Sequence, residues 1–543
     1  MHCLKLNCFL VSISMFLVHD AVAAATCASL SQLKLPNTTI TGAQSFAAGK
    51  FTPPPQFSLR QPPPVPVAFC RVTGSIKPTS DSDINFELWL PESGWTGRYE
   101  SVGNGGFAGS IRYDSMVRPL MGGSAVASTD DGHSAPAVGP KSASWALGHP
   151  EKVIDYGYRA VHLTAEEAKQ ITAAFYGSPP KHSYFVGCSK GGQEGLMEAQ
   201  RFPEDFDGIV TGAAANQWTD LFSSFPWGAK INLANRASYI APQDLEKIGA
   251  AVAAACDAAD GVKDGLISDP LSCRVESSKI GLSPEQLKTF ETIHDGPKTS
   301  AGERVYAGLP YGGETVQWNR TVTGPSFELA PVEAEESMYG NSFFANFVYR
   351  DPNWTFRSFD VDKSPIDARK KVGQILNADD VHFTKFKARH GKIVAFHGWA
   401  DSIVTPLGAI SYYNKVAAAQ DPRGRNGAEG DGNTVDARAL EETQKFFRLF
   451  LAPAVGHCAG GPGPNEFGQR GGDGDAQHDI VVALEQWVEK DIPPTRLIAT
   501  KFESDDHTKA ATMTRPLCAF PAMAKYKGKG SADDADNFVC AAN

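Results

Sequence analysis

The sequence predicts an α/β fold built on a mostly parallel sheet. Short apolar runs alternate with helix-periodic stretches from about residue 71 to 215, and the alternation resumes after about residue 386. Within the first part, the run 'YFVGCSKGG' joins a strand to a helix through glycines. Alternating strands and helices form parallel sheets that helices cover on both faces. The 543 residues, 42% of them hydrophobic, suffice for a large core.

Residues 1–25 have the pattern of a signal peptide. Lys5 precedes an apolar segment at 9–18, and 'AVAAA' at 21–25 offers small residues for cleavage. The apolar segment is too short to span a bilayer, and no later segment reaches about 18 uninterrupted apolar residues. We therefore expect an exported, soluble protein without a membrane span, in the periplasm or the extracellular space.

The charge of the chain argues against nucleic acid as a partner. The formal net charge is −10, and no run of Lys and Arg interleaved with aromatic residues occurs. The acidic balance favours solubility.

The cysteine count predicts disulfides. Of ten cysteines, Cys3 and Cys8 leave with the signal peptide, so an even number remains for an oxidising compartment. Eight cysteines allow about a hundred pairings, and a zinc cluster lacks the close Cys-x-x-Cys spacing. The eight are Cys27, Cys70, Cys188, Cys256, Cys273, Cys458, Cys518 and Cys540.

Residues 26–215 are expected to form the first part of the core. A Pro-rich segment at 26–70 predicts an extended, irregular wrap, and we pair Cys27 with Cys70 because they flank it. Strands are then expected at 'INFELWLP', which alternates in polarity, 'RYESV', 'GSAVAST', 'YFV' and 'FDGIVTG'. Helices are expected at 'YGYRAVHLTAEEAKQITAAFYG', which ends at Gly177, and at 'QEGLMEAQRF'.

The remaining chain divides into an insertion and a second core part. Residues 216–385 are rich in aromatic residues and lack the strand–helix rhythm, so we interpret them as a lid domain inserted into the core; a separate domain without a role at the site is the alternative. Residues 386–543 predict strands at 'GKIVAFHGWAD', 'KFFRLFLAPAVG' and, as the last, 'TRLIATKF'. Helices are expected at 'SYYNKVAAAQ' and 'DIVVALEQWVEKD', and 'QDPRGRNGAEGDGNTVDAR' reads as an exposed flexible loop.

The stretch around Ser189 predicts a nucleophile elbow. Gly187 and Gly191 flank the serine in a Gly-x-Ser-x-Gly pattern between a strand and a helix, the arrangement of an α/β-hydrolase. A Cβ at either glycine would crowd the sharp turn. The alternative is an ordinary Gly-rich loop between a strand and a helix.

A serine nucleophile needs a base and an acid that orients it. In α/β-hydrolases these follow in the order Ser, Asp or Glu, His. Asp401 comes after the strand 'KIVAFHGWA', and His457 lies in the Gly-rich loop after 'FFRLFLAPAVG'. His397 is the rival base, but it precedes Asp401; Asp130 and Asp131 are weaker candidates for the acid because they precede Ser189.

Two further features support a hydrolytic site. Cys188 precedes Ser189 and Cys458 follows His457, so a bond between these cysteines would hold nucleophile and base together. An oxyanion would be held by two backbone donors: the N–H of Lys190, and Gly105 or Gly106 in 'GNGGF'.

The stretch 'CDAADGVKDGLISDPLSC' at 256–273 indicates a calcium loop. Asp257, Asp260 and Asp264 lie close together among Asp-Gly turns, and calcium prefers hard oxygen ligands on a flexible loop. A Cys256–Cys273 disulfide would close the loop and contribute about 3 kcal/mol. A solvated acidic turn is the alternative.

With these residues assembled, the chain resembles the tannase and feruloyl esterase family. The matching motifs are 'GNGGFAG', 'RAVH', 'GCSKGG', 'CDAADGVKDGLI', 'HGWADSIVTP' and 'GHCAGGPG', which extend from about residue 70 to the C-terminus. The resemblance implies an α/β-hydrolase core with a lid inserted after the elbow, and ester hydrolysis through an acyl-enzyme. It carries over Ser189, Asp401 and His457 as the triad, bridged by Cys188–Cys458.

The resemblance also implies a structural calcium in the lid. Its ligands would be Asp257, Asp260 and Asp264 with the carbonyls of Val262 and Leu266. A Cys518–Cys540 disulfide would close the C-terminal segment.

Family substrates are esters of aromatic acids: gallate, ferulate, p-coumarate and the terephthalate monoester of ethylene glycol. Aromatic side chains of the lid are candidates to hold the acyl group: Trp218, Phe222, Trp227, Phe344 and Trp354. A hydrolase-fold binding protein without turnover, and a peptidase or lipase, are the alternatives.

Overall fold

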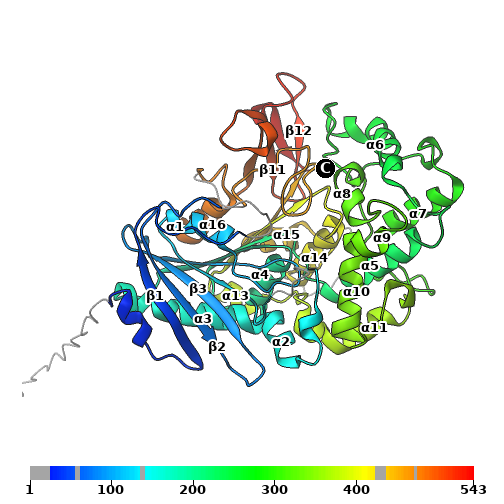
Figure 1. The fold of residues 1–543 in the computed structure, drawn as a ribbon. Helices are drawn as coiled ribbons and strands as arrows, with labels where there is room; N and C mark the ends of the chain where they lie inside the picture. Colours follow the sequence, from blue (N-terminus) through cyan, green and yellow to red (C-terminus); the bar gives the residue numbers. More distant parts are fainter. Residues whose placement is uncertain (1–24, 56–61, 135–140, 422–435, 470–473, 543) are drawn as a thin grey trace, which may run out of the picture.

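A computed structural model describes residues 25–55, 62–134, 141–421, 436–469 and 474–542. A nine-stranded sheet in the order β1-β2-β3-β5-β4-β6-β7-β8-β9 forms its centre (Figure 1). The strands are β1 (Thr38–Phe46), β2 (Phe69–Ile76), β3 (Ile84–Pro91), β4 (Arg98–Val102), β5 (Ala125–Thr129), β6 (His182–Cys188), β7 (Gly208–Gly212), β8 (Lys392–Gly398) and β9 (Phe447–Ala452). From β5 through β4 to β9 neighbouring strands are parallel, whereas β1, β2 and β3 add an antiparallel edge.

Helices cover both faces of this sheet. On one face lie α3 (Ala160–Tyr176), α4 (Lys190–Arg201) and α14 (Pro406–Ala419), which share one buried apolar cluster with the strands. On the other face lie α1 (Tyr113–Met121) and α16 (Ile480–Lys490). An ion pair between Arg118 and Asp479 joins these two helices. Helix α3 ends where Gly177 takes a positive φ of 74°, which glycine adopts without a Cβ penalty. The predicted α/β fold is confirmed.

Several local predictions need correction. Residues 38–46 are not irregular wrap: they form β1, which pairs antiparallel with β2. Their β-branched residues favour a strand. The many prolines that follow dominate the composition of residues 26–70 and hid this signal. Strand β3 does not alternate in burial, because α1 and α3 cover both of its faces and only Asn85 is exposed. Most of the loop predicted at 420–438 lies outside the described residues. The predicted signal peptide lies outside them as well, except for residue 25.

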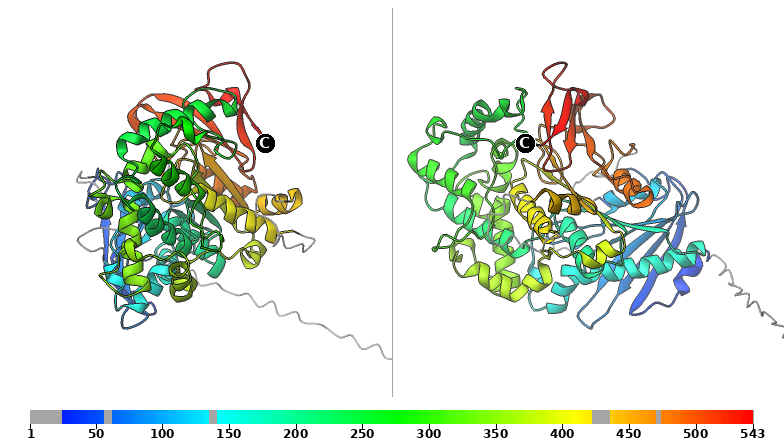
Figure 2. Two further views of the ribbon diagram at one scale, coloured as in Figure 1. Left: turned by 90° about the vertical axis from the view of Figure 1, so that its right-hand side faces the viewer. Right: turned by 180° about the vertical axis from the view of Figure 1, so that it is seen from behind.

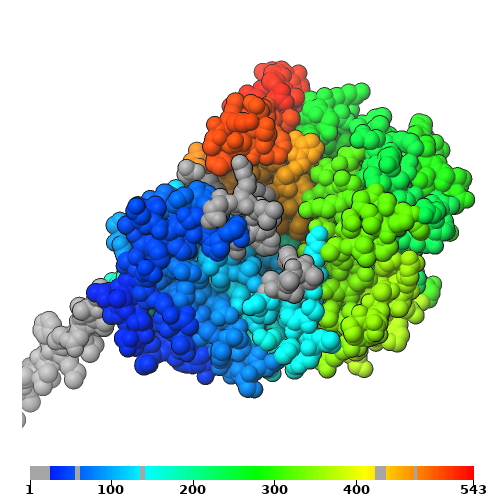
Figure 3. All heavy atoms as spheres, viewed as in Figure 1, coloured from blue at the N-terminus to red at the C-terminus, as the bar shows by residue number. Residues whose placement is uncertain are grey.

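The C-terminal segment also differs from prediction. Strand β10 (Arg496–Phe502) is not the last one and does not join the central sheet; it pairs with β11 (Ala511–Cys518). Strands β12 (Met523–Tyr526) and β13 (Phe538–Ala541) form a second small pair. In Figure 3 these strands, in orange and red, adjoin the green insertion.

Between β7 and β8 the chain forms a large helical insertion. The right-hand view of Figure 2 shows it as one green body beside the sheet. Its helices are α5 (Trp218–Asn232), α6 (Pro242–Cys256), α7 (Pro284–Asp295), α8 (Glu314–Thr321), α9 (Ala330–Glu333), α10 (Glu335–Phe343), α11 (Ser364–Ala368), α12 (Gln374–Leu376) and α13 (Thr384–Ala388). Aromatic side chains of α5 and α10 pack against Phe107 and Tyr156 of the core, so the insertion and the sheet share a buried cluster. Helices α2 (Pro150–Ile154) and α15 (Ala437–Gln444) lie outside the insertion.

All four expected disulfides are present. They join Cys27 to Cys70, Cys188 to Cys458, Cys256 to Cys273 and Cys518 to Cys540. Within the described ranges, we find no helix that is long and apolar enough to cross a membrane.

Candidate active site

Ser189 lies at a sharp turn between β6 and α4. Its backbone has φ 65° and ψ −119°, a conformation that L-residues rarely adopt. A Cβ on Gly187 would come within 2.5 Å of the Gly191 carbonyl oxygen, so this turn can close only with glycine there. The turn presents the Ser189 hydroxyl to a cavity above the carboxyl ends of the strands.

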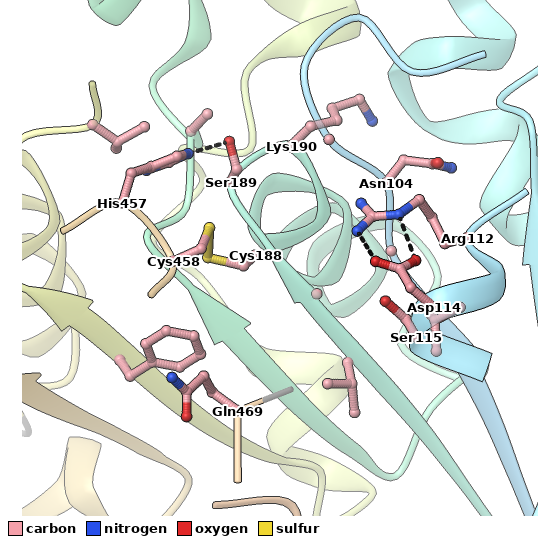
Figure 4. Close-up of a pocket in the computed structure, with 18 of the residues that line it drawn as sticks. Asn104, Arg112, Asp114, Ser115, Cys188, Ser189, Lys190, His457, Cys458 and Gln469 are labelled. Carbon is pink, nitrogen blue, oxygen red and sulfur yellow. Dashed lines mark hydrogen bonds and ion pairs between the residues drawn. A yellow bond between two sulfur atoms is a disulfide. The ribbon is translucent and has the colours of Figure 1, made fainter. Parts of the chain in front are cut away.

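His457 bridges Ser189 and Asp401. Its Nδ1 lies 2.7 Å from Asp401 Oδ2, and its Nε2 lies 2.8 Å from Ser189 Oγ (Figure 4 shows the latter contact). An ionised carboxylate only accepts hydrogen bonds, so Nδ1–H donates to Asp401 and the unprotonated Nε2 accepts from the serine. The imidazole is thereby oriented to take the serine proton.

Asp401 is fixed and kept ionised by its surroundings. It is 1% exposed, and its Oδ1 accepts the backbone N–H groups of Ile403 at 2.9 Å and Val404 at 3.0 Å. Burial on its own would raise the pKa of Asp401, but the electrostatic interaction with His457 and hydrogen bonds from His397 and His457 outweigh it and hold the pKa well below its usual range.

None of the rival residues takes the place of Asp401 or His457. His397 is 1% exposed, and its Nε2 lies 2.7 Å from the Val404 carbonyl and 3.2 Å from Asp401 Oδ2, so it supports the carboxylate. Asp130 accepts hydrogen bonds from the backbone and side chain of Asn85 instead of a histidine, and burial raises its pKa to about 7. Asp131 lies beside Asn104, with 3.1 Å between its Oδ1 and the Asn104 amide nitrogen.

The Cys188–Cys458 disulfide joins the two loops that carry Ser189 and His457. The Cα atoms are 5.9 Å apart although 270 residues separate them in sequence. Figure 4 shows the bridge next to the Ser189–His457 pair. Because each cysteine adjoins one of these residues, the bridge limits how far the serine and the imidazole can separate.

The expected oxyanion donors line the same cavity. Lys190 is the first residue of α4, so its backbone N–H has no acceptor within the helix. Gly105 and Gly106 also line the cavity, on the loop that follows β4. This loop is held against the elbow because the Gly191 N–H donates to the Asn104 carbonyl at 2.8 Å.

The cavity has a volume of about 870 Å³, and its lining is part apolar and part charged. The apolar residues of the lining include Trp218, Leu221, Phe222, Phe225, Ile403 and Val404. The rings of Trp218 and Phe222 stack on each other with centroids 4.4 Å apart, so together they form an aromatic wall of the cavity.

Three of the aromatic residues expected at the site do not line this cavity. Phe344 and Trp354 are 0% and 8% exposed, and their rings stack on each other 4.8 Å apart inside the insertion. Trp227 packs against the same buried cluster. They help to build the core of the insertion, which explains the aromatic content of this stretch.

Sequence reasoning missed the arginines that line the cavity. Arg98, Arg112 and Arg118 line it and pair with carboxylates, among them Glu485 at 2.9 Å and Asp114 at 3.1 Å. These residues come from β4, α1 and α16, so no local motif could have indicated that they meet.

Sequence reasoning also missed Gln317. This residue of α8 accepts the backbone N–H of His457 at 3.1 Å through its side-chain oxygen. The insertion thus makes a direct contact with the loop that carries His457.

The acidic loop at 256–273 has donors that suit a hard cation. One oxygen each of Asp257, Asp260 and Asp264 accepts N–H groups of the loop itself. The second oxygen of Asp260 is buried and has no hydrogen-bond partner among the described residues. Arg515 of β11 pairs with the second oxygen of Asp264 at 2.5 Å. Oxygen ligands, an orphaned carboxylate and a disulfide-closed loop fit a calcium ion.

A second cluster of possible metal ligands lies on the face of α3 and α4. The ligand atoms of His162, which belongs to the 'RAVH' motif, Glu198 and Asp205 lie within 4.8 Å of one another. Here Lys169 already supplies a cation, with its Nζ 3.8 Å from Asp205 Oδ1, and His162 Nδ1 lies 2.6 Å from Asp205 Oδ2.

The fold and the Ser–His–Asp arrangement define an α/β-hydrolase. Residues 70–541 match the sequence model of the family described as tannase and feruloyl esterase. The chain therefore belongs to the tannase and feruloyl esterase family, and it is a carboxylic ester hydrolase.

Three individual comparisons agree with this assignment. The chain is 39% identical over 550 residues to an uncharacterized esterase of Xanthomonas campestris pv. campestris, covering 96% of this chain and 92% of the relative. It is 30% identical over 480 residues to a probable feruloyl esterase B-2 of Aspergillus flavus, covering 84% of each. The crystal structure of feruloyl esterase B from Aspergillus oryzae superposes with a TM-score of 0.82 at 25% identity, covering 95% of this chain and 99% of that one.

Proposed function

We propose that this protein is a serine esterase that hydrolyses esters of aromatic acids through an acyl-enzyme. The observation that carries the proposal is the hydrogen-bonded chain from Ser189 through His457 to Asp401, at the edge of a cavity with an aromatic wall. Buried acid, oriented base and nucleophile at these distances constitute a catalytic triad.

The mechanism follows from the geometry. Ser189 Oγ attacks the ester carbonyl while His457 Nε2 takes its proton, and Asp401 stabilises the imidazolium that forms. The backbone N–H of Lys190 and that of Gly105 or Gly106 hold the oxyanion of the tetrahedral intermediate. His457 then returns the proton to the leaving alcohol. A water molecule, activated by the same imidazole, releases the acid from Ser189.

The aromatic wall supports an aromatic acyl group. An aromatic ring of the substrate would stack on Trp218 or Phe222, since offset or edge-on ring contacts are favourable beyond the area that they bury. The names of the feruloyl esterase relatives point in the same direction.

Calcium is a further part of the proposal. Asp257, Asp260 and Asp264, with the carbonyls of Val262 and Leu266, would hold the ion and fix the loop. It would compensate the buried carboxylate of Asp260 and take no part in the reaction. Calorimetry of wild type against Asp260→Asn tests it: calcium should bind to the wild type alone, and equal binding or no binding to either would refute it.

We also propose that the protein is exported. The four disulfides support this, because such bonds persist in oxidising compartments, and so does the composition of residues 1–25. N-terminal sequencing of protein recovered from outside the cytoplasm would find a start near residue 26 if the proposal holds.

An ester panel tests the function. Acid release is measured from methyl gallate, methyl ferulate, methyl p-coumarate and the terephthalate monoester of ethylene glycol, with Ser189→Ala alongside. We expect hydrolysis of at least one ester by the wild type and none above background by the variant. A folded wild type that releases no acid but binds these esters would be a binding protein, and activity that survives in the variant would refute the role of Ser189.

A further inference from the structure

A buried charged group lies directly behind the elbow. The Lys190 side chain is 1% exposed and points away from Ser189 (Figure 4). Its Nζ donates to Glu194 Oε1 at 2.8 Å, lies 3.9 Å from Asp131 Oδ2 and sits 4.5 Å from the centre of the Tyr156 ring. Lys190 therefore contributes its backbone to the site and its ammonium group to the interior.

Glu194 connects this group to the other half of the oxyanion hole. It is 1% exposed, and its Oε2 accepts the backbone N–H of Asn104 at 2.9 Å. Asn104 immediately precedes Gly105 and Gly106. One carboxylate thus binds the residue that follows the nucleophile and the loop that faces it.

The two segments are in close contact. A Cβ on Gly103 would lie 2.7 Å from the Gly191 Cα and 2.9 Å from Glu194 Oε2. The side-chain amide of Asn104 donates to the Thr129 carbonyl at 2.8 Å and to Asp131 Oδ1 at 3.1 Å, which fixes the far side of the loop. Small movements of this loop would change the separation of the two donors.

We propose that Glu194 is a positioning residue that fixes the two backbone donors of the oxyanion hole relative to each other. The proposal rests on the esterase function proposed above. A buried ion pair is a poor source of stability, because desolvating two charges offsets their attraction. Its value here is geometric, since oxyanion donors must be in place before charge develops on the substrate.

Two double variants separate this role from the burial of charge. Lys190→Met/Glu194→Gln removes both charges but keeps an oxygen that can accept the Asn104 N–H. Lys190→Met/Glu194→Met removes the charges and the acceptor, at similar side-chain volume. Both keep the backbone N–H of residue 190.

We expect kcat of the Met double variant to be at least about tenfold below that of the Gln double variant, with KM nearly equal in the two. Loss of a whole oxyanion donor costs about 10²- to 10³-fold in kcat, so a displaced one should cost less. Affinity for an aryl boronic acid, which forms a tetrahedral anion on the serine, should fall as kcat/KM does. Affinity for the planar product acid should not change.

The control is Glu198→Gln, one turn further along α4. Glu198 is also 1% exposed, but no hydrogen bond joins it to the loop at 103–106 among the described residues, so kcat should stay at the wild-type value. If a double variant does not fold, the kcat of the single variant Glu194→Gln is measured instead. Its amide oxygen can accept from either Lys190 or Asn104, so its NH₂ group must face the other donor. Equal kcat in the two double variants, or a loss confined to KM, would overturn the proposal. An inactive wild type would instead refute the esterase function.

Discussion

The substitution Asp401→Asn tests the orientation of the base. Asp401 Oδ1 accepts two backbone N–H groups, from Ile403 and Val404, and Oδ2 faces His457 Nδ1. An asparagine must place its carbonyl oxygen toward the two backbone donors, since its NH₂ group would face them donor to donor. The NH₂ group then points at His457.

This arrangement forces the wrong tautomer on His457. Nδ1 must accept from the asparagine, so Nε2 carries the proton and can no longer take one from Ser189. In serine proteases the corresponding change lowers kcat about 10⁴-fold, equivalent to about 5 kcal/mol of transition-state stabilisation. We expect a loss of that order here, with little change in KM.

The assay is steady-state hydrolysis of the best ester of the panel at neutral pH. Asp130→Asn is the matched control, because Asp130 is also buried next to a sheet strand but bonds to Asn85 and not to a histidine. The control should keep kcat within about twofold. A folded Asp401→Asn enzyme that loses less than about tenfold would refute the assignment of Asp401 as the orienting acid.

Three further predictions follow from the structure. Replacing Cys188 and Cys458 by serine should lower kcat by up to about 10²-fold, because small misplacements of reacting groups are that costly. Replacing Cys518 and Cys540 by serine should leave kcat unchanged, and equal effects of the two replacements on kcat would contradict this prediction. Removing calcium with EGTA should lower Tm, by the equivalent of about 3 kcal/mol at calcium a hundredfold above Kd, and magnesium should not restore it; a Tm indifferent to EGTA would argue against the ion. Burial raises the pKa of Glu100 from 4.5 to about 8, so the folded state holds this proton more tightly than the unfolded chain, and stability is lost as pH rises between these values. The free energy of unfolding of Glu100→Gln, relative to that of the wild type, should therefore rise by up to about 5 kcal/mol between pH 4.5 and 8 in thermal unfolding. A difference that does not change with pH would contradict the raised pKa of Glu100.

Local motifs and one topological rule sufficed to predict the central site. Glycines around Ser189 mark a turn that few other residues allow, and the carboxyl ends of parallel strands meet at one edge of a sheet. Asp401 and His457 each follow a strand that pairs into the same sheet, so their convergence was predictable. The cysteines beside Ser189 and His457 added a distance constraint between those two loops.

The surroundings of the site could not be predicted in the same way. Gln317 reaches His457 from a helix 140 residues earlier in the chain, and Glu194 reaches Asn104 across 90 residues. Neither contact leaves a periodic or spaced signal. A charged residue inside the 'QEG' stretch of the elbow helix is the one hint, because a helix packed tightly under a sheet has little room for an unpaired glutamate.

Aromatic composition likewise does not say which rings face a ligand. Trp218 and Phe222 lie on the first turns of α5, next to the elbow, and line the cavity. Phe344 and Trp354 are of the same chemical kind but pack into the insertion, because its helices also need a core. The N-terminal strand β1 was missed for a related reason: composition averaged over a segment hides a short ordered element.

The central claim is that Ser189 carries the acyl group. The most direct measurement is mass spectrometry of the enzyme after reaction with a fluorophosphonate probe, with peptide mapping of the adduct and prior incubation with an aromatic ester as competitor. We predict one adduct, on Ser189, and the ester should suppress its formation. The variant Ser189→Ala should form no adduct, and Asp401→Asn should form it more slowly. An adduct on another residue, or no adduct on a folded enzyme that hydrolyses the ester, would contradict the account.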